Sequence, residues 1–66
     1  MNIHAPSEEI RERFKCLEFV GVPFERVAFD GKRKKYMRAK HRTLGLTMFY
    51  CFEDDFAWFP ERAFDQ

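Results

Sequence analysis

This 66-residue chain has few cysteines, few glycines and no long apolar stretch, and each shortage excludes a class of protein. Two cysteines, Cys16 and Cys51, are too few for a disulfide framework, although one bridge between them stays open. The three glycines are isolated, so no glycine-rich phosphate loop is present. The longest strongly apolar stretch, residues 44–52, is far too short to span a bilayer. Residues 1–9 hold no apolar run that could act as a signal sequence, so we expect a cytoplasmic protein with free thiols and no membrane association.

The sequence also lacks the patterns of catalytic and metal sites. The acidic run Glu53, Asp54 and Asp55 has neither the length nor the central glycine of a calcium loop, and we interpret it as a polar turn. The histidines and cysteines show no zinc-binding spacing. A chain this short has little room for a substrate cleft. We therefore expect a protein that is not an enzyme and that uses no metal or other cofactor.

Aromatic residues, by contrast, are abundant: nine Phe, two Tyr and one Trp. We expect residues 1–66 to form a single small domain. Such a domain buries only about 60% of the surface that its unfolded chain exposes, whereas each buried ring removes roughly 150–250 Å² from water. Twelve rings are many for so small a core, so we expect some at the surface or at a homodimer interface, since association often supports domains of this size.

The charge of the chain is unevenly distributed. Residues 32–42, called here the basic run, contain seven of the twelve Lys and Arg residues and no acid. Residues 1–31 carry a net charge of −2 and residues 43–66 a net charge of −4. The field of the basic run would attract a polyanion or an acidic protein surface.

The N-terminal pattern predicts a helix over residues 7–20. Ser7 suits the N-cap position, and two glutamates follow it in the first turn, where the helix dipole favours negative charge. Gly21 is typical of the position just beyond a helix end. Apolar residues recur at spacings of four and three, at Ile10, Phe14 and Leu17.

The dipeptide Asp30-Gly31 predicts the two-residue turn of a β-hairpin, because both central positions of such a turn need positive φ. Its strands would cover residues 24–29 and 32–38. A helix over residues 33–42 is the competing interpretation, since Lys, Arg, Met and Ala are good helix formers. The turn signal directly before the basic run favours the hairpin.

Residues 44–52 give the clearest strand pattern. Both of its alternating faces are largely apolar, which predicts a central strand. Residues 53–55 would form a three-residue loop, and residues 56–59 a short fourth strand. That loop length places Tyr50 opposite Trp58.

Together these elements predict an α+β fold, with an N-terminal helix followed by a three- or four-stranded antiparallel meander and hairpins around Asp30-Gly31 and Asp54-Asp55. One helix can cover only one face of such a sheet. The other face would keep several aromatic side chains uncovered, and an uncovered aromatic face usually marks a contact surface. The rings predicted to form this interaction surface are Tyr50, Phe52, Phe56 and Trp58, or else Phe49 and Phe59 if the other face is the open one. The alternative is that the C-terminal segment with Phe64 folds back and covers the face.

The leading hypothesis is a small nucleic-acid-binding accessory or regulatory protein whose basic hairpin contacts the phosphates of DNA or RNA. Tyr36 and Trp58 would stack on bases. The predicted nucleic-acid contacts are Lys32, Arg33, Lys34, Lys35, Tyr36, Arg38, Lys40 and Arg42. The alternative is a protein-interaction module, such as a compact inhibitor or adaptor, in which the basic run steers encounter with an acidic partner and the aromatic surface docks on it.

Overall fold

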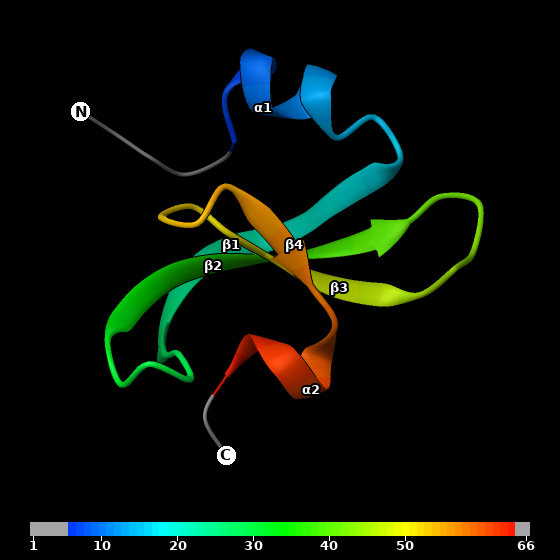
Figure 1. Ribbon diagram of the computed structural model, residues 1–66. Coiled ribbons are helices and arrows are strands. Elements are labelled where there is room, and N and C mark those ends of the chain that lie inside the picture. The colour runs from blue at the N-terminus through cyan, green and yellow to red at the C-terminus, as the bar shows by residue number, and fades with distance from the viewer. Residues whose placement is uncertain (1–5, 65–66) are drawn as a thin grey trace.

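The fold is known from a computed structural model, which describes residues 6–64. Its strands form one antiparallel sheet in the order β1-β2-β3-β4, so the sheet is a meander with a short helix at each end of the chain (Figure 1). The predicted order of a helix followed by antiparallel strands is therefore found, in a molecule that is mostly β. The elements are α1 (Glu8–Arg13), β1 (Leu17–Val27), β2 (Arg33–His41), β3 (Thr47–Cys51), β4 (Phe56–Trp58) and α2 (Pro60–Ala63).

The first helix is much shorter than predicted. Ser7 is its N-cap, as expected, and the Ser7 hydroxyl accepts a hydrogen bond of 3.3 Å from the backbone N–H of Ile10. The helix ends at Arg13, however, and β1 begins at Leu17, so the prediction of a helix to residue 20 is wrong. A strand places Leu17 and Phe19 on the same face of the sheet, whereas a helix would turn them apart.

The basic run forms a strand of a β-hairpin, which confirms the hairpin over the competing helix. The turn differs from the prediction. Val27 pairs with Arg33, and the Ala28 N–H donates a hydrogen bond of 2.8 Å to the Lys32 carbonyl, which leaves three residues, 29–31, in the turn instead of two. Within this turn only Gly31 adopts positive φ, at 84°, and the Asp30 carboxylate accepts a hydrogen bond of 2.9 Å from the backbone N–H of Lys32. Residues 24–27 of β1 therefore each pair with the β2 residue one position before the expected one. A shift of one residue reverses which β2 side chains share a face with a given β1 side chain.

The β3–β4 hairpin is shifted by one residue as well. Phe49 lies opposite Trp58, so the prediction that Tyr50 faces Trp58 is wrong. The connecting turn contains four residues, 52–55, rather than three, and Asp55 adopts a positive φ of 52°. Two aromatic residues that were expected to be neighbours consequently lie on opposite faces of the sheet.

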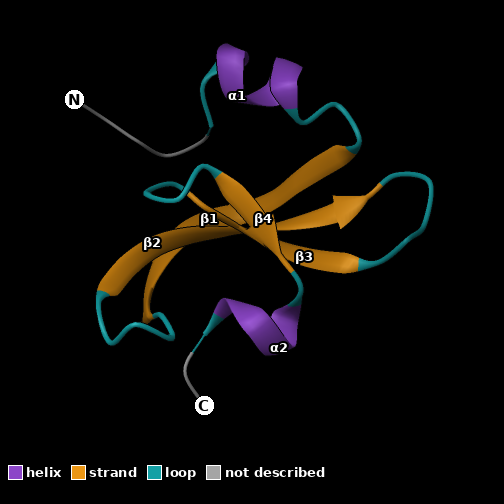
Figure 2. Cartoon of the chain, in the orientation of Figure 1, coloured by secondary structure: helices purple, strands orange, loops and turns teal. Residues whose placement is uncertain are grey.

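The two helices lie on opposite sides of the sheet (Figure 2). On the side called here the α2 face, the ring of Phe64 packs edge-on against Tyr36, with centroids 4.7 Å apart. On the α1 face, Phe14 packs edge-on against Tyr50 at 5.2 Å. Each face therefore has its own small core. The expectation of an uncovered face is wrong, and the alternative holds instead, because the C-terminal segment with Phe64 folds back over that face. The buried apolar side chains are Leu17, Ala28, Tyr36, Met37, Ala39, Tyr50, Cys51, Ala63 and Phe64.

The acidic segment before β4 forms a turn, as predicted, and its carboxylates tie neighbouring elements together. Asp55 accepts hydrogen bonds from both terminal nitrogens of Arg13, and the Tyr50 hydroxyl donates to it at 2.6 Å. Glu53 accepts a hydrogen bond of 2.9 Å from the backbone N–H of Lys35. These bonds fix α1 and β2 against the β3–β4 turn. Within residues 6–64, no three His, Cys, Asp or Glu side chains gather closely enough to hold a metal ion.

Candidate functional site

The cations of the basic run are divided between the two faces of the sheet. β2 pairs with β1 on one side and with β3 on the other, and its side chains alternate in direction. Arg38 and Lys40 lie on the α2 face, whereas Arg33 and Lys35 lie on the α1 face. The cations of the basic run therefore do not form one continuous surface, and a single flat ligand contacts only some of them at a time.

Ion pairing within the described residues involves one cation of the run, Lys34. Its Nζ lies 2.9 Å from Oδ1 of Asp54 and 3.2 Å from Oδ2 of Asp30. The hydrogen bond to Asp54, followed by the one to Asp30, raises the pKa of Lys34, so its ammonium stays charged. The exposed cations of the run are Lys32, Arg33, Arg38, Lys40 and Arg42.

Tyr36 belongs to the core rather than to the ligand-accessible surface. Its side chain is 1% exposed, and its hydroxyl donates a hydrogen bond of 2.8 Å to the carbonyl of Ala63. Burial raises the pKa of this hydroxyl to about 12. Buried in this way, the Tyr36 ring offers no face to a nucleobase. Its position among exposed cations suggested a contact residue, and only the placement of α2 over it shows otherwise.

The predicted interaction surface of four rings does not exist as one surface. Tyr50 is 1% exposed and lies on the α1 face, where Phe52 contacts it with centroids 5.1 Å apart. Phe56 and Trp58 lie on the α2 face and contact each other at 4.7 Å. The extra residue in the β3–β4 turn separates the two pairs, because a shift of one residue changes the face of every side chain that follows.

The same shift brings cations and rings together on the α2 face. Arg38 pairs with Phe49, and Phe49 pairs with Trp58, so these three side chains form one row across the sheet. Adjacent strands lie about 4.8 Å apart, which puts the backbones of Arg38 and Trp58 about 10 Å from each other. Lys40 extends this surface along β2, and Phe56, 51% exposed, extends it along β4. We call this set the Arg38 surface: Arg38, Lys40, Phe56 and Trp58.

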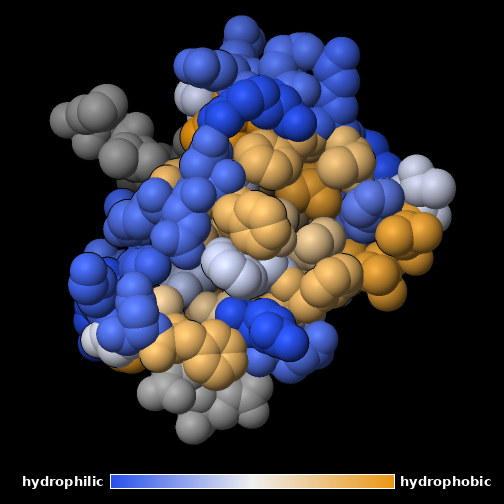
Figure 3. Space-filling model, in the orientation of Figure 1, coloured by the Kyte–Doolittle hydropathy of each residue, from blue (hydrophilic) through white to orange (hydrophobic). Residues whose placement is uncertain are grey.

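Apolar side chains also gather where β4 and the β2–β3 loop meet solvent (Figure 3). Phe59 is 47% exposed, and the loop residues Leu44 and Leu46 are 64% and 45% exposed. Residue 44 was predicted to begin a central strand, but β3 begins only at Thr47. The two leucines therefore stay outside the sheet and remain accessible.

Both cysteines are free thiols, so the bridge that the sequence left open is absent. Cys16 is exposed at the surface, whereas Cys51 is completely buried in the core of the α2 face. Burial raises the pKa of the Cys51 thiol and keeps it protonated. Cys51 consequently acts as a small apolar core residue.

Comparison of the chain with protein-family models, with curated proteins and with solved structures gives no match. Residues 6–64 include no helix with the length and apolar character that crossing a bilayer requires.

Proposed function

We propose that this protein binds single-stranded nucleic acid through the Arg38 surface. The observation that carries the proposal is the row across the α2 face, which places an exposed guanidinium and an aromatic ring on one side of the sheet. Lys40 adds a second cation next to Arg38 along the same strand. Proteins that bind single strands combine cations, which follow the phosphates, with rings on which bases stack.

The charge state of the surface supports this proposal. Arg38 and Lys40 form no ion pair with any described carboxylate, so their charges remain available to phosphates. Across β1, Arg38 faces Val20, whereas Lys40 faces Glu18 without forming an ion pair with it, so Arg38 is the cation with no acidic neighbour on β1. Cations that neutralise phosphates release counterions, so binding should weaken steeply as salt increases.

The exposure of the rings favours a single strand over a duplex. Phe56 is half exposed at the open edge of β4, next to the partly exposed Trp58. A base in a duplex is already stacked, whereas an unpaired base can stack on such a ring for about 1–3 kcal/mol. Rings and phosphate contacts on one sheet face therefore suit an extended, unpaired strand.

The experiment compares two charge reversals on opposite faces of β2. Arg38→Glu and Arg33→Glu change the same residue type on the same strand, and each arginine is exposed and faces a valine of β1. A labelled single-stranded oligonucleotide is titrated at several salt concentrations. We expect Arg38→Glu to weaken binding about tenfold or more and to lower the salt slope by about one, and Arg33→Glu to bind like the wild type.

Equal loss in both variants would show that the α2 face is not the contact surface. Absence of wild-type binding even at low salt would refute nucleic-acid binding altogether. Circular dichroism of both variants, recorded beforehand, separates loss of contact from loss of fold.

A protein-interaction module remains the second candidate, and the exposed Leu44, Leu46 and Phe59 favour it. Exposed apolar side chains in the β2–β3 loop and just beyond β4 suit a protein partner better than a phosphate backbone. A pull-down from host extract, run with and without nuclease, distinguishes the candidates. A stoichiometric protein complex that survives nuclease and is lost in Leu44→Ser supports the module, whereas partners that vanish after nuclease support nucleic-acid binding.

A further inference from the structure

A pocket of about 330 Å³ opens on the α2 face, between the β1–β2 turn, β4 and α2. Its volume lies at the lower end of the range of about 300–1,000 Å³ that is usual for ligand pockets. It therefore suits one small planar group better than an extended cofactor. The side chains around it are Ala28, Phe29, Asp30, Lys34, Tyr36, Asp54, Trp58, Arg62 and Ala63.

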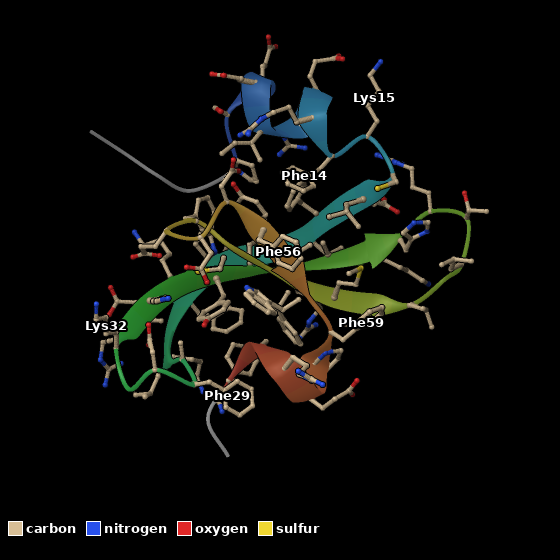
Figure 4. All side chains as sticks on the ribbon, in the orientation of Figure 1. Phe14, Lys15, Phe29, Lys32, Phe56 and Phe59 are labelled. Atoms are coloured by element: carbon tan, nitrogen blue, oxygen red, sulfur yellow. The ribbon has the colours of Figure 1, made fainter. Side chains whose placement is uncertain are left out.

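Two aromatic side chains line this pocket in addition to the buried Tyr36. Phe29 is 56% exposed in the β1–β2 turn, beside α2 (Figure 4). Trp58 lines the pocket from β4 and is partly buried. Rings of this kind accept a nucleobase by stacking.

The polar groups of the pocket combine acceptors and donors side by side. The Lys34 Nζ lies between Oδ1 of Asp54 and Oδ2 of Asp30, so a cation and two carboxylates line one wall. An ammonium has three N–H donors, and each carboxylate accepts several hydrogen bonds. The wall can therefore bind a ligand edge that carries both N–H donors and an oxygen or nitrogen acceptor. Arg62 contributes a further cation on the α2 side.

Guanine matches this wall better than the other bases do. Its pairing edge places two N–H donor groups beside the O6 acceptor, so a carboxylate can accept from both donors while a lysine donates to the oxygen. Adenine, cytosine and uracil each present only one donor group on that edge. We infer that the pocket binds a guanine base, stacked against Phe29 and Trp58 and hydrogen-bonded by Asp54 and Lys34. For guanine within a strand, this inference rests on the proposed function, because the pocket and the Arg38 surface share Trp58.

Trp58 is the only tryptophan of the chain, so its fluorescence reports on the pocket directly. The wild-type protein is titrated with guanosine monophosphate and, separately, with the adenosine, cytidine and uridine monophosphates. We expect saturable quenching by guanosine monophosphate, with affinity roughly tenfold or more above that for the other three. The absence of saturable quenching, or equal quenching by adenosine monophosphate, would overturn the inference.

Three variants locate the site. Phe29→Ala removes one stacking ring from an exposed turn, and Asp54→Asn removes the carboxylate that accepts from guanine, so each should weaken binding by roughly tenfold. Phe59→Ala is the matched control, because Phe59 is exposed to a similar extent, 47% against 56%, and does not line the pocket. Equal losses in Phe29→Ala and Phe59→Ala would place the ligand elsewhere.

A second titration distinguishes a free nucleotide from a guanine within a strand. An oligothymidine with one central guanine is compared with an oligothymidine that lacks it. Tighter binding of the first strand, lost in Phe29→Ala, supports guanine recognition within a strand. Salt-dependent binding that is sensitive to Arg38→Glu but indifferent to guanine would refute the pocket inference alone, whereas binding of the mononucleotide without any strand binding would refute the proposed function alone.

Discussion

Tyr36 and Arg38 show how much neighbouring positions of one strand can differ. Both side chains point to the α2 face, but Phe64 and Ala63 cover Tyr36 and leave Arg38 in solvent. The difference comes from a four-residue helix at the far end of the chain rather than from the residues next to either side chain. For this reason a pattern of alternating residues cannot by itself tell the contact residue from the core residue.

The buried hydroxyl of Tyr36 should stabilise the fold. Tyr36→Phe removes the hydrogen bond to the Ala63 carbonyl and leaves that oxygen in the core without its donor. The free energy of unfolding should fall by about 1 kcal/mol. Urea unfolding followed by circular dichroism measures this difference. An unchanged tryptophan band in the near-ultraviolet circular dichroism, which comes from Trp58 alone, serves as the control for intact aromatic packing. A variant as stable as the wild type would contradict the prediction.

At the level of elements, two turns decide the pairing of the sheet. Each is one residue longer than predicted, and each has a residue at positive φ: Gly31 in the first and Asp55 in the second. The second turn is stabilised by ion pairing and by the Tyr50 hydroxyl, so its length depends on contacts with α1 and β3. Turn length then determines which rings share a face with Arg38.

Gly31 should tolerate asparagine better than alanine. A Cβ at this position would meet no atom within 4 Å, so the cost of substitution lies in the φ of 84° rather than in a clash. Gly31→Ala should lose about 1 kcal/mol of unfolding free energy. Gly31→Asn should lose less, because asparagine enters the left-handed region more readily. Thermal unfolding of the two variants side by side provides the measurement, and equal losses would show that φ is not the cause.

At the scale of the whole molecule, three aspartates hold the turns to the sheet and to α1. The pKa of Asp30 is lowered by the Lys32 backbone N–H and then by Lys34, that of Asp54 by Lys34, and that of Asp55 by Arg13. All three values lie below the ordinary 3.8 of an aspartate. A carboxylate with a lowered folded-state pKa stabilises the fold above its unfolded pKa, and this contribution is lost as pH falls through the folded value.

The protein should therefore lose stability on acidification, starting as pH approaches 3.8 and continuing below it. Asp55→Asn should be less stable than the wild type near neutral pH and should show a flatter decline in acid. Glu12→Gln is the control, because the Glu12–Lys15 pair is fully at the surface, where such pairs contribute little. Melting temperatures across pH test this prediction, and parallel curves for wild type and Asp55→Asn would contradict it.

Local chemistry made several features predictable. The Ser7 cap, the hairpin ahead of the basic run and the polar turn before β4 all follow from residues that are neighbours in the chain. The helix was predicted too long because Ile10, Phe14 and Leu17 satisfy a helical spacing. In the fold, residues 17–20 pair with β2 instead, and the hydrogen bonds of the strand pair satisfy their backbone N–H and C=O groups. The pocket escaped prediction, since its lining residues come from four separate parts of the chain.

The sequence by itself determined the element order, the antiparallel meander and the exposure of most cations of the basic run, because these depend on local backbone preference and on charge. The tertiary structure alone decided which residues share a face. That outcome depends on two turns whose lengths are set by contacts with Arg13, Lys32 and Tyr50, and on the position of α2. Because side chains alternate with every residue of a strand, one residue in a turn is enough to move a ring from one surface to the other.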